Sequence, residues 1–501
     1  MQTAFPETAF CPLPSAPHGH GAIERGACTG PGRFLAGALR SPGPAGPVPD
    51  CPQMSLLRLL APNERDNLGI MGTIPDSNRI EAGGRAAQQA RPLVAIASVI
   101  LSLGLIAVGN GLMFAYIPVR LGAEGIDPVW AGLIVTGLSA GGLAGCIFTG
   151  PLVRRVGHAR VFMVLSALIA LSNVAIAAVA NPLLWVAARA LYGFAICGLF
   201  VVSQSWLNDA VENAIRGRVM ALSSVAYIAG LGIGYYTLAL VDISTTSAPL
   251  IGIAFTALSI LPVGLTRLPQ PAPPAAASVA LARAWRISPV GVAGMLAVGG
   301  LSMTISGFAP IHATAKGYSQ ADVALLLASM PVGTLILQMP LGWLSDRTDR
   351  RYVLIGAAVL AAVAGLLALG FDGSALAVLI VIYVIWDGAA ESVYSLSTAH
   401  ASDRAGREDL VALSSTLLFA WALSGFVVPG LITVLSAVYG TQAFIHVAVV
   451  IAAAYALFVA WRVARAEPAA ATANFAPMTA QAPPAVDLAF SPDEAARPAE
   501  P

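Results

Sequence analysis

The stretch GWLSDRTDRR, residues 342–351, directly follows a long apolar segment and is rich in charged residues. Its counterpart GPLVRRVGHAR, residues 150–160, begins 342 − 150 = 192 residues earlier. The motif ALSS also occurs twice, at Ala221 and at Ala412, which lie 412 − 221 = 191 residues apart. Two matches at nearly the same spacing indicate a chain built from two copies of one unit.

The composition indicates which solvent surrounds these copies. Of 501 residues, 57% are hydrophobic and 11% are charged, whereas about 25% of the residues of a soluble domain are charged. Many apolar runs reach the roughly 20 residues that a helix needs to cross a bilayer. The chain is therefore predicted to be a multi-pass protein of the lipid bilayer. Its net charge of +1 gives no argument for nucleic acid, and its cysteine spacing fits no metal site.

Between the two ends of the chain the apolar runs predict twelve spans. In the first half they are expected near 93–118, 129–153, 161–180, 182–208, 218–241 and 247–265. In the second half they are expected near 289–311, 321–344, 352–371, 374–399, 409–437 and 441–462. The predicted fold is all-α and integral to the membrane, with two six-helix bundles related by pseudo-symmetry about an axis along the membrane normal.

The predicted bundles occupy residues 91–266 and 289–463, and a cytoplasmic linker of residues 267–288 joins them. The linker is polar and rich in proline, with a short interfacial helix expected around Trp285. Residues 1–90 and 464–501 are rich in Ala and Pro, which predicts disordered tails. Met54 and Met71 are alternative starts, and the residues before Met71 are expected to be dispensable.

The arginines predict the orientation of the chain, because cytoplasmic loops carry an excess of positive charge. One set of loops holds Arg154, Arg155, Arg160, Arg216, Arg218, Arg267, Arg283, Arg286, Arg347, Arg350, Arg351, Arg404, Arg407, Arg462 and Arg465. The opposite set holds only Arg120 and Lys316. We therefore expect both termini in the cytoplasm, and we expect a bacterial inner membrane as the location.

Six plus six spans, a long central linker and GWLSDRTDRR together resemble the major facilitator superfamily of transporters. The positions that match its loop motif are Gly342, Asp346, Arg347, Arg350 and Arg351. The first-half copy holds Gly150, Arg154 and Arg155. It departs from the pattern, since Arg154 stands where most members have Asp. The stretches VVSQSWLNDAVENAIRGRVMALSS and LSTAHASDRAGREDLVALSS resemble the bacterial YcaD-like branch, which implies a transporter fold without a settled substrate.

The loop motif suits a gate, because its arginines lie within reach of Asp346 and Asp349 and such a cluster can form in one conformation and break in another. The alternative is that these arginines only set the topology and contact lipid headgroups. Glycines one turn apart, at Gly137, Gly141 and Gly145, form a flat helix face. This face is either static packing or a sliding surface between the halves.

Two predicted spans carry polar stripes, which should face water or each other because charge is costly in lipid. In span ten the stripe consists of Tyr383, Asp387, Glu391, Tyr394 and Thr398, with Trp386 beside it. In span four it consists of Arg189, Gln204 and Asn208. The resemblance implies that spans one, four, seven and ten line a central cavity. That adds Asn110, Tyr116, Ser302, Thr304 and Ser306 as candidates.

Asp387 and Glu391 are the strongest candidates for a coupling site. Two carboxylates one turn apart repel each other, so one is expected to hold a proton nearer neutral pH than a free side chain does. The pair could carry protons, hold a cationic substrate, or form a static ion pair with Arg189. Gln204 stands where members of the branch often have Glu, so a proton role at that position is in doubt.

These observations predict a secondary transporter of a small solute that works by alternating access, coupled to protons and acting as an exporter. A transport-deficient sensor or scaffold, or a facilitative uniporter, is the alternative. We expect no enzymatic activity, since the sequence contains no Walker loop, zinc spacing or nucleophile elbow. We also expect no cofactor, no metal and a monomer.

Overall fold

The computed structural model describes residues 77–211, 213–266, 279–371, 375–406 and 409–465. Its helices are α1 (Ser77–Ala123), α2 (Pro128–Val156), α3 (His158–Ala178), α4 (Pro182–Ala210), α5 (Asn213–Thr237), the 3-10 turn η1 (Leu238–Leu240), α6 (Ser247–Leu265), α7 (Leu281–Ile287), α8 (Pro289–Ala315), α9 (Gln320–Ser345), α10 (Arg350–Gly370), α11 (Leu376–Ser402), α12 (Leu410–Tyr439) and α13 (Ala443–Val463). Twelve of them are long and apolar enough to cross a membrane. The predicted number of spans is therefore confirmed.

The structure adds detail at the start of the first bundle and in the linker. Helix α1 begins at Ser77, so it overlaps the last part of the predicted tail. Residues 77–92 contain many Ala, Gln, Arg and Glu residues, which form helix readily without an apolar pattern. The rest of that tail, Met71 and the tail after residue 465 lie outside the described residues. Helix α7 confirms the expected linker helix, and its Trp285 packs on Phe458 with ring centroids 5.9 Å apart.

Polar side chains cap the N-terminal ends of several spans. The Asp127 side chain accepts a hydrogen bond from the backbone N–H of Val129 at 2.8 Å, and the Asn181 side chain accepts one from Leu184 at 3.1 Å. Ser319 and Asp322 form a reciprocal capping box at the start of α9. These caps satisfy backbone groups that a helix leaves unpaired at its first turn.

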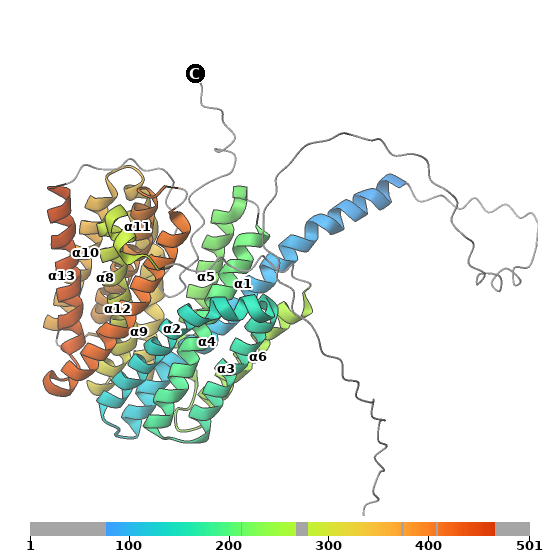
Figure 1. Cartoon of the computed structure of the whole chain (residues 1–501). Helices are drawn as coiled ribbons and strands as arrows, with labels where there is room; N and C mark the ends of the chain where they lie inside the picture. Colours follow the sequence, from blue (N-terminus) through green and yellow to red (C-terminus); the bar gives the residue numbers. More distant parts are fainter. Residues whose placement is uncertain (1–76, 212, 267–278, 372–374, 407–408, 466–501) are drawn as a thin grey trace, which may run out of the picture. The chain divides into compact units, whose positions relative to one another are not determined.

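The helices pack in equivalent pairs within each half. Figure 1 shows the first half in blue to green and the second half in yellow to red. Helices α2 and α4 approach so closely that a Cβ at Gly141 would lie 1.8 Å from the carbonyl oxygen of Ala190. In the second half, a Cβ at Gly333 in α9 would lie 1.9 Å from the carbonyl oxygen of Val384 in α11. These glycines are 333 − 141 = 192 residues apart, which is the spacing of the loop motif. The structure therefore repeats as the sequence does.

The same contacts decide between the two interpretations of the glycine face. A Cβ at Gly137, Gly141 or Gly145 would meet the backbone of α4, which belongs to the same half. A face that holds two helices of one half together cannot slide against the other half. Static packing is therefore the role of these glycines, because only glycine allows the backbones to come this close.

The halves share a buried core at one end, whereas at the other end Leu143 and Cys146 of α2, both partly buried, pack against the core of the second half. The far side is defined here as the end that holds Arg120 and Lys316, and the terminal side as the end that holds the 154–155 and 347–351 loops. At the far side one apolar core contains residues of both halves, for example Met113 of α1 and Ile305 of α8. At the terminal side each half has its own core. Hydrogen bonds reinforce the far-side contact: Gln320 in the second half donates to the carbonyl oxygens of Leu238 at 2.5 Å and Val241 at 2.6 Å.

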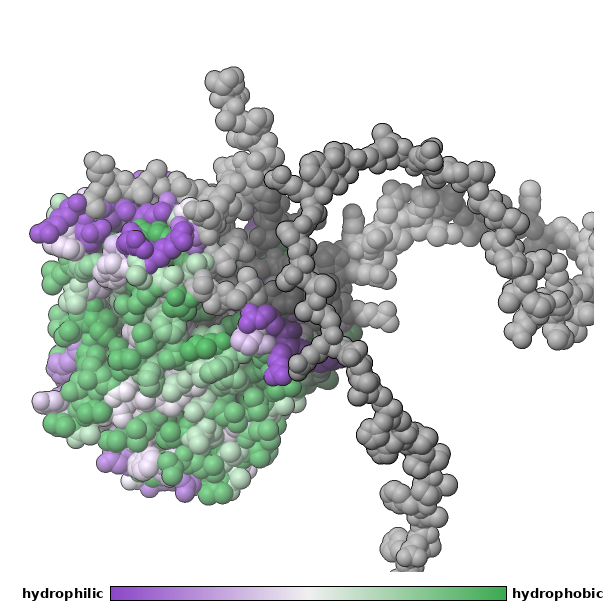
Figure 2. Space-filling view, viewed as in Figure 1, coloured by the Kyte–Doolittle hydropathy of each residue, from purple (hydrophilic) through white to green (hydrophobic). Residues whose placement is uncertain are grey.

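The outer surface agrees with a membrane environment. Figure 2 shows hydrophobic residues over most of the visible face of the bundle, and hydrophilic residues gathered toward its ends. Large apolar side chains such as Phe148, Leu183 and Val434 are exposed on the protein surface. In water a patch of this extent would be a liability, whereas in lipid it is required. The chain is a multi-pass membrane protein.

Candidate functional site

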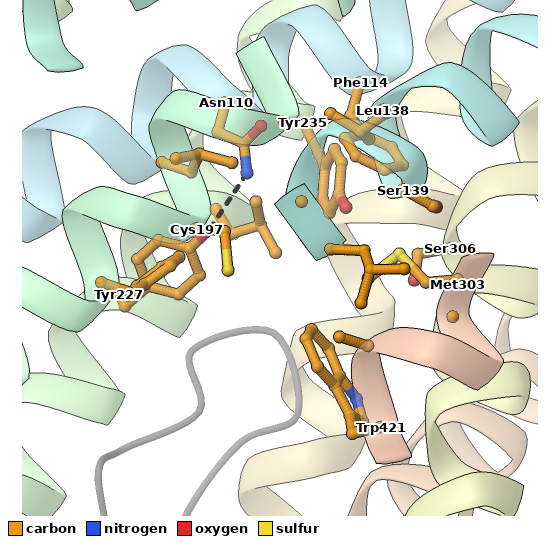
Figure 3. A pocket seen from close by; sticks show the side chains of 18 residues that line it. Asn110, Phe114, Leu138, Ser139, Cys197, Tyr227, Tyr235, Met303, Ser306 and Trp421 are labelled. Atoms are coloured by element: carbon orange, nitrogen blue, oxygen red, sulfur yellow. Dashed lines mark hydrogen bonds between the residues drawn. The ribbon is translucent and has the colours of Figure 1, made fainter. Parts of the chain in front are cut away.

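A central cavity lies between the two halves, where the shared core ends (Figure 3). It has a volume of about 100 Å³ and is lined by α1, α2, α4, α5, α8 and α12. Its wall is largely apolar and includes the aromatic side chains of Phe114, Phe200, Tyr227, Tyr235 and Trp421. Among the described residues that line it, none carries a formal charge. The cavity suits the apolar body of a small solute.

A few neutral polar groups interrupt this apolar wall. Asn110 donates from Nδ2 to the Tyr227 hydroxyl at 3.0 Å, which Figure 3 draws as a dashed line. The other amide atom of Asn110, Oδ1, is buried without a hydrogen-bond partner, as is the indole N–H of Trp421. Buried polar groups usually have partners. Two polar atoms in the cavity wall are therefore left for a solute or for water.

The two carboxylates of span ten lie outside this wall. Glu391 accepts a hydrogen bond from the Ser302 hydroxyl at 2.5 Å, and Asp387 accepts one from the Thr334 hydroxyl at 3.1 Å. Both acids are almost completely buried, at 1% and 2% exposure. The Tyr235 phenol, which lines the cavity, lies close enough to feel the charge of both acids.

This placement corrects the expected cavity lining. The lining residues come from spans one, two, four, five, seven and eleven, and none comes from span ten. The reason is that α8, the seventh span, lies against α11 and presents Ser302 to Glu391. The polar stripe of α11 therefore faces hydroxyl groups inside its own half instead of open water.

Arg189 lies in α4 with 2% of its surface exposed. Its guanidinium carbon lies 4.1 Å from the ring centre of Tyr192 and 5.6 Å from that of Phe114. Among the described residues it forms no ion pair, so the static pair with Asp387 or Glu391 is not formed in this structure. It borders a second, smaller cavity.

Several other candidates of the two stripes are buried, while the side chain of Asn208 lies outside the described part of the chain. Trp386 stacks on Phe444 and meets Tyr383 edge-on, and Tyr394 belongs to the terminal-side core of the second half. Gln204 is buried with no partner for its Oε1, and it does not line the central cavity. The structure thus brings Asn110 to the cavity and separates Gln204 from it.

The loop motif of the second half forms a tight charged cluster. Arg350 is buried and donates from Nε to Asp403 at 2.7 Å and from Nη1 to the Ser345 hydroxyl at 2.9 Å. Its Nη1 also lies 3.2 Å from Asp346, the C-cap of α9. The cluster therefore ties the ends of α9, α10 and α11 together within one half.

Arg351 belongs to the same loop and pairs with Asp349 in a fork, the shortest distance being 2.6 Å from Nη2 to Oδ2. Burial alone would raise the pKa of the Asp349 carboxyl, but hydrogen bonds and charge from Arg351 hold it below its usual value of 3.8. A carboxylate with a depressed pKa stabilises the fold above that value. The contribution is lost as the pH falls below 3.8 and through the depressed pKa.

The remaining motif residues differ between the halves. The carbonyl of Gly342 accepts from the Ser345 hydroxyl, and the Arg347 guanidinium lies 3.7 Å from the ring centre of Trp343. In the first half Gly150 has open space around it, while Arg154 and Arg155 are exposed. With Arg154 in place of an acid, the described residues of that copy contain no cluster like the one around Arg350.

We expect Asp403→Asn to lower the free energy of unfolding by about 2 kcal/mol, because the buried Arg350 guanidinium loses one carboxylate partner and keeps Asp346. Thermal melting of the purified protein measures this effect. Asp409→Asn is the matched control, since its partner Arg283 is 55% exposed and such a pair contributes less than about 1 kcal/mol. Equal melting temperatures of the two variants would contradict the structural role of Asp403.

Several residues of the site were not predicted from the sequence. Tyr227 and Tyr235 lie eight residues apart in span five, so they share a helix face, but this span was not expected to line the cavity. Trp421 and Asp403 were not among the predicted site residues. The tyrosine spacing was a usable signal. The contact between Arg350 and Asp403 was not, because it joins residues far apart in the chain.

The sequence and the fold of the chain are similar to those of known proteins. The model of the Major Facilitator Superfamily matches residues 99–290 and 290–493. An uncharacterized MFS-type transporter, YcaD of Escherichia coli O7:K1, is 25% identical over 342 residues, which cover 68% of this chain and 87% of that protein. Among solved structures, the nucleoside transporter NupG gives a TM-score of 0.61 at 14% identity, covering 74% of this chain and 100% of NupG. A D-xylose–proton symporter gives 0.56 at 16% identity, covering 73% and 96%.

Proposed function

Because the chain belongs to the Major Facilitator Superfamily, we propose that it is a proton-coupled secondary transporter, which moves a small amphiphilic solute through the central cavity by alternating access. The family and the relatives are transporters and not enzymes. They take small-molecule substrates and lie in the membrane. The proposal adds the coupling ion, the character of the solute and the direction.

One observation carries the coupling to protons: two nearly buried carboxylates lie one turn apart beside the cavity. Removing two negative charges from water at the same place is unfavourable, and protonating one acid relieves both the desolvation and the repulsion. Ser302 and Thr334 can hydrogen-bond either form, since a hydroxyl donates and accepts. A pair that binds and releases a proton as its exposure changes can couple proton movement to solute movement.

The cavity wall supports an amphiphilic solute over a simple cation. Its aromatic side chains offer an apolar surface, and the free atoms of Asn110 and Trp421 offer one acceptor and one donor. No carboxylate lies in the wall to hold a cation. Export remains our proposed direction.

We further propose a bacterial inner membrane, with both termini in the cytoplasm and a monomeric chain. The positive charge of the terminal-side loops supports this orientation. With that orientation, the shared far-side core closes the cavity toward the outside. A reporter that fluoresces only in the cytoplasm, fused after residue 501, should be bright.

The transport proposal is tested in proteoliposomes with fluorescent amphiphiles of anionic, neutral and cationic type. We expect an imposed pH gradient to drive accumulation of at least one amphiphile, and a protonophore to abolish it. Protein-dependent flux that only equilibrates the amphiphile across the membrane, with or without the pH gradient, would indicate a uniporter. No protein-dependent flux of any probe, with correctly folded protein, would favour a sensor or scaffold.

A further inference from the structure

Arg189 is a buried cation without an anionic partner. Its Nη1 has no hydrogen-bond partner and, among the described residues, the guanidinium forms no ion pair. The rings of Tyr192 and Phe114 attract it by cation–π contact. Such contacts replace only part of the hydration that a charge loses on burial, so buried charges are normally paired. The site lacks one negative group.

A cavity beside Arg189 offers a place for a negatively charged group. A small cavity of about 20 Å³ borders the guanidinium, between α1, α2 and α4, and Gly307 of α8 closes it from the other half. This is room for roughly one water molecule, or for a headgroup of similar size. The remaining wall is apolar and supplies no acid. The small cavity can hold a compact anionic group but not a whole solute.

This small cavity adjoins the central cavity. Phe114 and Leu138 line both, so these two side chains form the partition between them. Figure 3 shows Phe114 and Leu138 together at one edge of the central cavity. A rotation of the Phe114 side chain would join the two spaces. The combined site has an aromatic, uncharged body compartment and a cationic end.

We propose that the solute of this transporter is an organic anion, with its carboxylate bound by Arg189 and its aromatic or branched apolar body in the central cavity. The inference rests on the proposed function, because it names the substrate class of the same cavity. A planar guanidinium binds a carboxylate through two parallel hydrogen bonds, which a neutral amide or an ammonium cannot reproduce. The anion neutralises the buried cation, so binding removes an unfavourable charge from the empty site.

The test uses three probes with one body and different headgroups: 4-phenylbutanoate, 4-phenylbutanamide and 4-phenylbutylammonium. The melting temperature of the purified full chain is measured against the concentration of each probe. We expect a saturable rise with the carboxylate and none with the amide or the ammonium. An equal rise with the amide or the ammonium, or no rise with the carboxylate, would overturn the proposal.

Substitutions of Arg189 test whether its guanidinium binds the carboxylate. Arg189→Met should weaken carboxylate binding at least about tenfold, since the charge-assisted pair is lost. Arg189→Lys should bind it with intermediate affinity, because the charge stays and the fork is lost. Arg160→Met, which removes an exposed arginine of α3, should bind it like the wild type and controls for partition of the probe into detergent. Wild-type affinity in Arg189→Met would refute the assignment.

The unliganded melting temperature separates binding from folding. Arg189→Met should melt at or above the wild-type temperature, because an apolar side chain of similar length replaces an unpaired buried charge. If this variant does not fold, Arg189→Lys and the headgroup series decide the question. Proton-driven flux of neutral solutes without carboxylate preference would refute this inference and keep the transport proposal. Carboxylate binding through Arg189 without flux would support this inference and refute the transport proposal.

Discussion

Asp387→Asn and Glu391→Gln should each insert and fold normally, and at least one of them should reduce pH-driven accumulation to the level of protein-free vesicles. The reason is that an amide has nearly the shape of a carboxyl group but takes up no proton. Each amide can still bond the hydroxyl that the acid bonds now, Thr334 for residue 387 and Ser302 for residue 391. Packing should therefore survive while coupling is lost.

The measurement is solute accumulation in proteoliposomes under an imposed pH gradient, followed by exchange without a gradient. Exchange should remain measurable in the variants, because it needs solute binding and the conformational change but no net proton movement. Asp242→Asn is the control, since this exposed far-side carboxylate removes the same charge away from the site. If both site variants still accumulate solute with unchanged pH dependence, the two acids do not couple transport.

Gly141→Ala should prevent stable folding, although it adds one methyl group. The new Cβ would lie 1.8 Å from the carbonyl oxygen of Ala190, so α2 and α4 would have to separate along their contact. Overpacking of a core usually costs about 1–3 kcal/mol, and a backbone carbonyl cannot rotate away as a side chain can. Gly333→Ala should fail in the same way in the second half, where the distance is 1.9 Å.

Yield of monodisperse protein and its melting temperature measure this effect. Gly264→Ala is the matched control, because this helical glycine of α6 has no atom within 4 Å of the added Cβ. It should keep or slightly raise stability, since alanine is favoured over glycine in a helix by about 1 kcal/mol. A wild-type melting temperature for Gly141→Ala would mean that α2 and α4 are not held this closely in the protein.

The fold could be predicted because its signals, the apolar length of each span and an internal repeat, can be detected in the sequence alone. Apolar length defines each span, and the 192-residue repeat from Gly150 to Gly342 defines the two halves. The site was predicted only in part, since a stripe on one helix does not tell which neighbour it faces. Asp387 and Glu391 form such a stripe. Hydroxyl groups of other helices, Thr334 and Ser302, donate hydrogen bonds to them. Neither acid lines the central cavity. Which residues a stripe contacts depends on how its helix is rotated about its own axis within the bundle, and the sequence pattern does not define this rotation.

Under the proposed alternating access, the apolar core that the two halves share at the far side should make their opening sensitive to temperature. When the halves separate there, side chains such as Met113 and Ile305 become exposed to the water that enters. Hydrating apolar surface raises the heat capacity and becomes less unfavourable on cooling. The state that is open at the far side should thus gain population in the cold, and plots of turnover against inverse temperature should curve. A sample chilled before freezing would then hold a different mixture of states from the protein at its growth temperature.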